Sequence, residues 1–357
     1  MSKIRVLVVD DAVVFRRLVA DELSADPAIE VVGTAANGRI ALAKLDQVNP
    51  DLVILDIEMP ELDGLATLRE IRKTRPRLPV IMFSALTERG AAASLDALSL
   101  GATDYFAKPV SAGGLDASRQ VLRDELIPEI KALCGRQANG SLLTPSPNPS
   151  PAAPAPRAEA AIVEVVAIAA STGGPNALAD VFAGLPADLP VPVVLVQHMP
   201  PMFTRLLAQR LSAHSAVPVE EAQAGGVLRP GHACLAPGDF HLAVGRDGDR
   251  VRTRLTQDPP ENSCRPAADV LFRSVARTFG PGTLAVVLTG MGQDGLRGCE
   301  AIRAAGGQVI VQDEATSVVW GMPGSVARAG LADRVLPLGL VGTEIVRRAR
   351  AGRGGRP

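Results

Sequence analysis

The chain has 357 residues, of which 47% are hydrophobic, enough for two globular domains that each bury a core of their own. The formal net charge is −1, so overall electrostatics give no reason to expect a nucleic-acid partner. No apolar run reaches the roughly 18 residues needed to span a membrane, and acidic residues follow the first apolar run too soon for a secretory signal. We therefore expect a cytoplasmic protein that does not insert into the membrane.

Short apolar runs alternate with amphipathic, helix-like stretches over residues 1–133. The runs are IRVLVV (4–9), VVGTA (31–35), DLVILD (51–56), PVIMFS (79–84) and DYFAK (104–108). Such alternation favours a parallel β-sheet with helices on both faces. Ligands of these sheets gather beyond the carboxyl ends of the strands, so the residues at those ends are candidates for function.

Polar side chains stand at the end of four of these runs. They are Asp10, Asp11, Asp56, Ser84 and Lys108. Converging carboxylates repel one another unless a hard divalent cation such as Mg²⁺ is present, whereas a hydroxyl and an ammonium group suit phosphoryl oxygens. Each residue alone is equally consistent with a cap of a strand or helix. The presence of all five polar residues at equivalent ends of the predicted strands favours a phosphoryl-transfer site.

These stretches resemble the receiver domain of two-component response regulators. The resemblance lies in VVDD (8–11), DLVILDIEMPELDGL (51–65), MFSA (82–85) and DYFAKP (104–109), and it covers residues 1–130. It implies a flavodoxin-like (βα)5 fold. It also implies that Asp56 accepts a phosphoryl group from a CheA-type histidine kinase, while Asp10, Asp11 and Asp56 hold Mg²⁺.

The same resemblance assigns three further residues of this domain. Ser84 would contact the phosphoryl group, Lys108 would pair with it, and Tyr105 would occupy the switch aromatic position. The role of Tyr105 is implied by the resemblance alone.

Residues 131–160 interrupt the alternation of apolar and amphipathic stretches. From Cys134 to Ala160 the chain is dense in Pro, Ser, Ala and Asn and shows neither helical nor alternating periodicity. Such a segment cannot bury enough apolar surface to order itself, so we predict a linker over 131–160. Residues 348–357 are basic and glycine-rich, which predicts a disordered tail.

The alternation resumes after the predicted linker. The runs are IVEVVAIAA (162–170), VPVVLVQ (191–197), HACLAP (232–237), HLAVG (241–245), TLAVVLTG (283–290) and GQVIVQD (307–313). We predict a second domain over 161–347 with a doubly wound, mostly parallel α/β fold. The four cysteines of the chain lie far apart without metal-ligand spacing, so we expect ordinary reduced thiols.

The first run of this second domain ends at Ser171, and two glycines and Pro175 then open a stretch of helical periodicity. Proline in a first helical turn and glycine in a tight turn both fit a helix start. Taken alone, Ser171 favours the N-cap of this helix, a position at which serine is common.

Two more strand ends change this interpretation. His198 directly follows the second run, and Asp294 follows a later one. A serine hydroxyl needs a base to take its proton, and an imidazole needs a carboxylate to fix its tautomer, so the three residues suit nucleophilic catalysis. The sequence around Asp294 is also consistent with a plain turn. His241 is a second histidine that could line the active-site cleft from a neighbouring loop. The neighbouring Gly290, Met291 and Gly292 indicate a backbone close to the substrate, with an N–H available to an oxyanion.

These stretches resemble the methylesterase domain of the CheB family of chemotaxis response regulators over about 161–347. The resemblance lies in IAASTGGPNAL (168–178), VLVQHMPPMFTRLLAQRL (194–211), LAPGDFHL (235–242), SCRPAADVLFRSVA (263–276), LTGMGQDGLRG (288–298) and GMPGSVARAG (321–330). It implies hydrolysis of glutamate γ-methyl esters on methyl-accepting chemotaxis proteins, deamidation of receptor glutamines, and no cofactor for the esterase reaction.

By this resemblance, three residues form the catalytic triad. Ser171 is the nucleophile, His198 the general base and Asp294 its orienting partner. Met291 and Thr172 would line the oxyanion and substrate site, and Arg265 would position the substrate or the facing loops. An alanine at 169 or 170 replaces a glycine of the family, and Cys234 stands where an aromatic residue is common; both differences bear on substrate fit.

Two other functions remain open on the sequence alone. The second domain could bind a partner without catalysis, its triad residues serving as caps and turns, or the esterase could serve a receptor array outside chemotaxis. If the second domain is an enzyme, we interpret the receiver domain as a lid over its catalytic face. A flexible linker keeps the receiver at high effective concentration near that face, and phosphorylation would shift the population in which the lid is closed.

Overall fold

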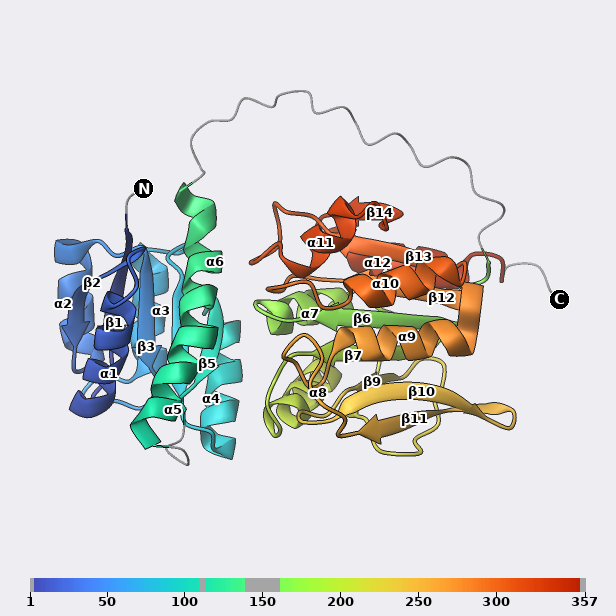
Figure 1. The fold of residues 1–357 in the computed structure, drawn as a ribbon, viewed down its shortest axis with the longest axis horizontal. Helices are drawn as coiled ribbons and strands as arrows, with labels where there is room; N and C mark the ends of the chain where they lie inside the picture. Colours follow the sequence, from blue (N-terminus) through green and yellow to red (C-terminus); the bar gives the residue numbers. More distant parts are fainter. Residues whose placement is uncertain (1–2, 110–113, 139–160, 354–357) are drawn as a thin grey trace, which may run out of the picture. The chain divides into compact units, whose positions relative to one another are not determined.

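The computed structural model describes residues 3–109, 114–138 and 161–353 (Figure 1). The chain divides into two compact units, Met1–Ser146 and Pro147–Pro357, each with its own sheet. Residues 139–160 of the predicted linker and residues 354–357 of the predicted tail lie outside the described residues. Among the helices of the described ranges, none combines the length and apolar composition needed to cross a lipid bilayer.

The N-terminal unit contains a five-stranded parallel sheet with the order β2-β1-β3-β4-β5. Its strands are β1 (Ile4–Val9), β2 (Ile29–Ala35), β3 (Leu52–Asp56), β4 (Val80–Ser84) and β5 (Asp104–Ala107). This is the flavodoxin-like order, which confirms the predicted fold. The central strands β3 and β4 are buried along their whole length, as expected for strands with helices on both faces.

Helices α2, α3 and α4 cover one face of this sheet, and α1 and the segment from α5 to α6 cover the other (Figure 1). The helices are α1 (Val13–Ser24), α2 (Gly38–Val48), α3 (Gly64–Thr74), α4 (Glu88–Ser99), α5 (Gly114–Val121), the π-helical η2 (Leu122–Leu126) and α6 (Ile127–Ala138). Asn37, Asp63 and Thr87 each accept a backbone N–H at the start of α2, α3 and α4. These side chains end the preceding loops and fix where the three helices begin.

The linker begins later than predicted. Residues 131–138 belong to α6, and Ile130, Leu133 and Cys134 of this helix are buried. Their helical spacing lets the helix bury one apolar face, which stabilises it despite the polar residues between them. The predicted start of the linker at residue 131 is therefore wrong by eight residues within the described range.

The C-terminal unit contains a seven-stranded parallel sheet with the order β14-β13-β12-β6-β7-β9-β8. Its strands are β6 (Val165–Ala170), β7 (Val193–Gln197), β8 (Val219–Glu221), β9 (Ala233–Leu235), β12 (Thr283–Val287), β13 (Gln308–Gln312) and β14 (Arg334–Leu336). The chain passes outward from β6 in both directions, so the sheet is doubly wound as predicted. Strands β6, β7 and β12 are entirely buried at its centre.

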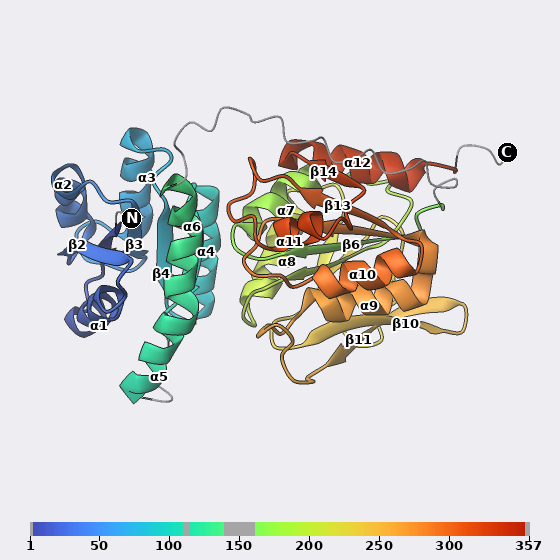
Figure 2. The same ribbon diagram turned by 45° about the horizontal axis from the view of Figure 1, so that its top comes forward.

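Two groups of helices enclose this sheet. Helices α7, α8 and α12 pack on one face, and α9, α10 and α11 pack on the other (Figure 2). Their bounds are α7 (Gly174–Ala183), α8 (Phe203–Ala213), α9 (Ala268–Phe279), η3 (Gly280–Gly282), α10 (Leu296–Ala304), α11 (Met322–Arg328) and α12 (Leu338–Arg350). On the second face, Leu271, Phe272 and Val275 of α9 are fully buried in the main apolar cluster.

One predicted strand belongs to a different sheet. Residues 241–245 fall in β10 (His241–Asp247), which pairs antiparallel with β11 (Arg250–Thr256) and not with the parallel sheet. The two strands are joined by a tight turn at Gly248, whose φ of 58° favours glycine. Placing 241–245 in the parallel sheet is therefore wrong. The alternating RVRTRLT of β11 is a strand signal that sequence reasoning missed.

The C-terminal domain also extends further than predicted. Helix α12 runs to Arg350, and Arg348 is buried against Glu344, with 2.7 Å between the guanidinium and the carboxylate. Arg353 donates to the backbone oxygen of Val163 at 2.7 Å. A disordered tail from residue 348 is therefore wrong for 348–353, because these arginines form ion pairs and hydrogen bonds with the domain.

Candidate functional site

The carboxyl edge of the N-terminal sheet brings together the acidic residues predicted for phosphoryl transfer. Asp10 directly follows β1, Asp56 ends β3, and Lys108 directly follows β5. Nζ of Lys108 lies 2.7 Å from Oδ2 of Asp10 and 2.8 Å from Oδ2 of Asp56. Carboxylate oxygens of Asp10, Asp11 and Asp56 all lie within 4.8 Å of one another. One ammonium group thus faces a cluster of three carboxylates.

This cluster fits a hard divalent cation such as Mg²⁺. Oδ2 of Asp10 is buried and has an ion pair with Lys108, but it makes no hydrogen bond within the described residues. Burial raises the pKa of Asp56 to about 6; Lys108 opposes this rise, and the charges of Asp10 and Asp11 add to it. A cation at these oxygens would offset the repulsion between the carboxylates and keep Asp56 ionised.

The predicted switch residues lie on the two neighbouring strands. Ser84 ends β4 one residue beyond Phe83, the register partner of Asp56. Its buried hydroxyl oxygen lies 2.8 Å from the hydroxyl oxygen of Ser94 in α4, so the strand end and this helix are coupled. Tyr105 lies in β5, where burial together with the charges of Asp104 and Glu129 holds its pKa well above the ordinary value.

In the C-terminal unit, a glycine turn places Ser171 between β6 and α7. Gly173 has φ 73° and is the N-cap of α7, and no side chain caps this helix. The alternative that Ser171 is the N-cap is therefore wrong. A Cβ on Gly174 would lie 2.0 Å from Oε1 of Gln197, whose Nε2 donates to the Ser171 backbone oxygen at 3.0 Å. Glycine at this position therefore leaves room for the Gln197 side chain, which fixes the backbone of the serine.

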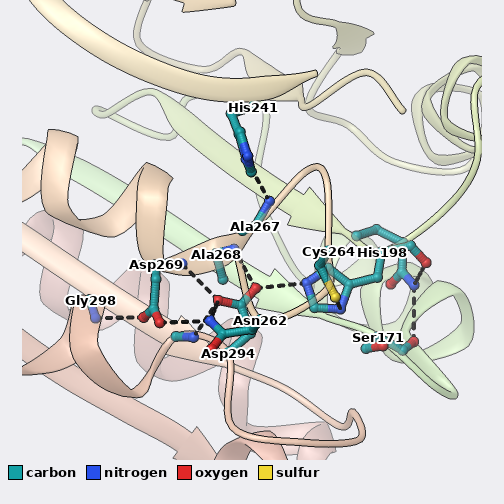
Figure 3. A network of polar contacts seen from close by, with 12 residues as sticks. Ser171, His198, His241, Asn262, Cys264, Ala267, Ala268, Asp269, Asp294 and Gly298 are labelled. Carbon is teal, nitrogen blue, oxygen red and sulfur yellow. Dashed lines mark hydrogen bonds and ion pairs between the residues drawn. The ribbon is translucent and has the colours of Figure 1, made fainter. Parts of the chain in front are cut away.

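His198 and Asp294 meet at the same sheet edge as Ser171. Ala170 and Gln197 are register partners in β6 and β7, so Ser171 and His198 leave the sheet side by side. Nε2 of His198 lies 2.8 Å from Oδ2 of Asp294 (Figure 3). The Asp294 side chain is only 3% exposed and that of His198 13%, so this pair is shielded from water.

The Asp294 carboxylate is held by the start of α9. It accepts the backbone N–H of Ala268 at 2.6 Å and that of Asp269 at 3.0 Å, and Nδ2 of Asn262 donates to it at 2.9 Å. Burial raises the pKa of Asp294, but the bond and charge of His198 and the backbone bonds from Ala268 and Asp269 outweigh burial and lower it. Asp294 therefore stays ionised and accepts the proton on Nε2 of His198, which leaves Nδ1 as the basic nitrogen.

The other ring nitrogen of His198 faces a cysteine. Nδ1 lies 3.6 Å from Sγ of Cys264 (Figure 3). Burial lowers the pKa of His198, but Asp294 and Cys264 outweigh burial and raise it to about 10. The contacts within the described residues include no hydrogen bond between the Ser171 hydroxyl and His198. The structure thus brings the three predicted triad residues to one edge but bonds only two of them to each other.

Met291 and Thr172 lie at the loops that flank Ser171. The Met291 side chain is exposed, and its backbone N–H makes no hydrogen bond within the described ranges. Thr172 is buried, and its backbone oxygen accepts the hydroxyl of Thr289 at 2.9 Å. The N–H of Ser171 donates to the backbone oxygen of Thr289 at 3.0 Å and is therefore already used. The Met291 N–H is thus available to a ligand at this edge.

The side chain of Arg265 contacts neighbouring loops of the same unit. Its guanidinium contacts Oδ1 of Asp239 through Nε at 3.0 Å, and it also donates to the backbone oxygens of Gln257 and Asp258. Of the two roles implied by the resemblance, these contacts correspond to positioning of the facing loops, because the donors point to loop oxygens.

His241 does not share the edge with Ser171. Its Nδ1 accepts the backbone N–H of Ala267 at 3.2 Å (Figure 3). Its Nε2 lies 3.2 Å from the backbone oxygen of Pro259. The side chain is 1% exposed. Both ring nitrogens are occupied in holding the loop before α9, so His241 is a structural histidine and not a second base.

Comparison with known proteins gives the family. Residues 166–345 match the model of the CheB methylesterase, and residues 6–119 match that of the response regulator receiver domain. A protein of Trichodesmium erythraeum (strain IMS101) named protein-glutamate methylesterase/protein-glutamine glutaminase is 53% identical over 98% of this chain and 99% of its own length. The chain belongs to the CheB methylesterase family. A relative of the same name from Nocardioides sp. (strain ATCC BAA-499 / JS614) is 54% identical over 98% of this chain and 96% of its own.

The fold of the CheB family is also found in a solved structure. The crystal structure of the Thermotoga maritima CheB methylesterase catalytic domain matches with a TM-score of 0.51 and 41% identity, over 52% of this chain and 99% of that one. This confirms the predicted fold of the C-terminal unit of this CheB family member.

Sequence reasoning missed three side chains of this site. Gln197 orients the Ser171 backbone, Asn262 donates to Asp294, and Cys264 contacts His198. Gln197 stands next to His198 at a strand end, so its position offered a signal. Asn262 and Cys264 lie in a loop without strand or helix periodicity, and no spacing in the sequence indicated them.

Proposed function

We propose that this chain is a phosphorylation-activated protein-glutamate methylesterase. It removes the methyl group from glutamate γ-methyl esters on the cytoplasmic helices of methyl-accepting chemotaxis proteins, and it works in the cytoplasm. The observation that carries the proposal is the shielded pair of His198 and Asp294 beside Ser171, with 2.8 Å between Nε2 and Oδ2. The names of the full-length relatives support the same reaction.

The reaction is acyl transfer to Ser171. The hydroxyl oxygen attacks the ester carbonyl carbon while Nδ1 of His198 takes the hydroxyl proton, and the carbonyl oxygen becomes an oxyanion to which the Met291 N–H donates. When the carbonyl re-forms, the bond to the methoxy oxygen breaks, and His198 gives its proton to that oxygen to release methanol. Water then attacks the acyl-enzyme by the same route and yields glutamate. Serine, imidazole and amide supply every group used, so we expect no cofactor for this step.

A receptor glutamine is the second substrate of the proposal. The same attack on its side-chain amide releases ammonia and leaves glutamate after hydrolysis. An amide nitrogen is a poorer leaving group than an ester oxygen, so for one oxyanion site this deamidation is the slower reaction.

Esterase activity should rise with pH. His198 acts as a base only when neutral, and its contacts raise the pKa above the ordinary value of about 6.5. We therefore expect kcat/KM to be low at pH 6 and to increase through a midpoint above 6.5. Initial rates of methanol release between pH 6 and 10, with the folded fraction followed by circular dichroism, measure this profile. A rise centred below 6.5 would contradict the pairing with Asp294.

The N-terminal unit is the regulatory part of the proposal. Asp56 accepts the phosphoryl group from a CheA-type histidine kinase, and Asp10, Asp11 and Asp56 hold Mg²⁺, which neutralises charge on the carboxylates and phosphoryl oxygens when bound. Lys108, which lies 2.8 Å from Asp56, pairs with the phosphoryl group once it is formed. Ser84 contacts the phosphoryl group, and its hydroxyl also contacts Ser94 of α4. Phosphorylation is thereby transmitted to α4 and alters the surface of the receiver domain at this helix.

The identity of the products tests the proposal. A receptor cytoplasmic fragment with methylated glutamates and unmodified glutamines is incubated with the full chain, and its peptides are weighed by mass spectrometry. Loss of the methyl mass at glutamates supports the esterase, and conversion of glutamine to glutamate supports the deamidase. An unchanged fragment from each of several receptors would favour a domain that binds without catalysis.

A further inference from the structure

The basic nitrogen of His198 is occupied by a residue for which the proposed reaction has no role. Asp294 takes Nε2 at 2.8 Å, and Cys264 Sγ lies 3.6 Å from Nδ1. This distance is within hydrogen-bond range for sulfur, a large and weak donor. Since Nδ1 must receive the proton of Ser171, the thiol and the serine hydroxyl need the same lone pair.

A single tight turn places this thiol. Glu261 and Cys264 exchange backbone hydrogen bonds of 3.1 and 2.9 Å, and between them Asn262 and Ser263 have φ values of 53° and 63°. Non-glycine residues pay a steric cost for this left-handed conformation. The turn directs Asn262 to Asp294 and Cys264 to His198, so one loop contacts both members of the pair.

We propose that Cys264 is a positioning residue of the esterase site, which holds Nδ1 of His198 at rest and must release it before Ser171 can transfer its proton. This inference rests on the proposed function, because it concerns the base of that reaction. With a neutral imidazole, the thiol donates to Nδ1; with an imidazolium, Nδ1–H donates to the sulfur. In both states the contact competes with Ser171.

The charges around His198 determine the direction of the pH effect. Within the described residues, Asp294 bonds to Nε2 of the ring and the thiol of Cys264 contacts Nδ1. One step further out, the backbone N–H of Asp269 donates to Asp294, and Glu261 pairs with Arg273. The contact with Cys264 raises the pKa of His198, as the bond to Asp294 does. Removal of the thiol therefore makes the neutral base available at a lower pH.

Two substitutions separate the hydrogen bond to Nδ1 from the cysteine itself. Cys264→Ala removes the contact with Nδ1, and we expect it to raise kcat/KM at pH 7 by about two- to tenfold, the range that one hydrogen bond accounts for. Cys264→Ser keeps a hydroxyl donor to Nδ1, so it should remain slower than Cys264→Ala at pH 7. Cys264→Ala should also move the pH midpoint downward. Cys134→Ala, in the other unit, is the matched cysteine control and should change neither quantity.

A second readout does not depend on turnover. In the full chain carrying Ser171→Ala, the ring signals of His198 are titrated by NMR with cysteine or alanine at position 264. A lower midpoint with alanine supports the proposal, and an unchanged midpoint overturns it, whatever the esterase rates. If the midpoint falls but no variant with Ser171 releases methanol from any receptor fragment, the contact stands and the proposed function fails.

Discussion

Replacing Ser171 by alanine is expected to lower methanol release from methylated receptor fragments by about 10³-fold or more, because no acyl-enzyme can form. Alanine removes only the hydroxyl, which makes no hydrogen bond within the described residues, so the fold should be preserved. Methanol release measures the effect, with circular dichroism as a check on folding.

Ser325→Ala is the matched control for this substitution. The Ser325 hydroxyl donates only to the backbone oxygen of Met322 in the first turn of α11, at 2.7 Å. This variant should retain nearly all activity. If Ser171→Ala released methanol as fast as Ser325→Ala, the nucleophile would have to be another group.

Replacing Asp294 by asparagine is expected to lower kcat by about 10⁴-fold. The carboxylate accepts the proton on Nε2 of His198 and thereby leaves Nδ1 free of hydrogen. An asparagine amide can donate to Nε2, which places the ring proton on Nδ1 and removes the base. The carboxylate charge is lost as well, so the pKa of His198 should fall toward its ordinary value. Steady-state rates and an NMR titration of the His198 ring measure both effects.

Asp269→Asn is the control for loss of a buried carboxylate. Oδ1 of Asp269 accepts the backbone N–H of Gly298 at 2.6 Å, and its Oδ2 accepts Nδ2 of Asn262, but it does not bond to His198. Both variants should cost about 1–3 kcal/mol of unfolding free energy, because each disturbs buried hydrogen bonds. Asp294→Asn should move the His198 titration far more than Asp269→Asn, because only Asp294 bonds to the ring. An equal loss of kcat in the two variants would mean that Asp294 acts through the fold alone.

The parallel sheets and the residues at their edges could be predicted from the sequence because both follow local rules. Asp56 and Ser84 end buried runs, and Ser171 and His198 directly follow others. In a parallel sheet those ends share one edge, so spacing along the chain predicts proximity in space. The same rule predicted that Asp294 lies close to His198.

Features that depend on long-range contacts could not be predicted. Cys264 reaches His198 from a loop 66 residues away, and nothing local distinguishes it from the other three cysteines. Residues 241–245 look like a strand of the parallel sheet, but their pairing depends on β11 and a turn at Gly248. The end of α6 was missed because three buried side chains, which only the tertiary fold reveals, outweigh the polar composition there.

Methanol release by the full chain, before and after treatment with acetyl phosphate and Mg²⁺, tests the central claim most directly. We expect a basal rate that rises on phosphorylation, and no rise when Asp56→Asn replaces the acceptor or when a chelator removes the cation. Asp46→Asn changes an exposed carboxylate of the same unit, with its side chain 91% exposed, and should keep the full response. A phosphorylated chain that releases no methanol from its cognate receptors, or an equal rise in the Asp56→Asn variant, would contradict a phosphorylation-activated esterase.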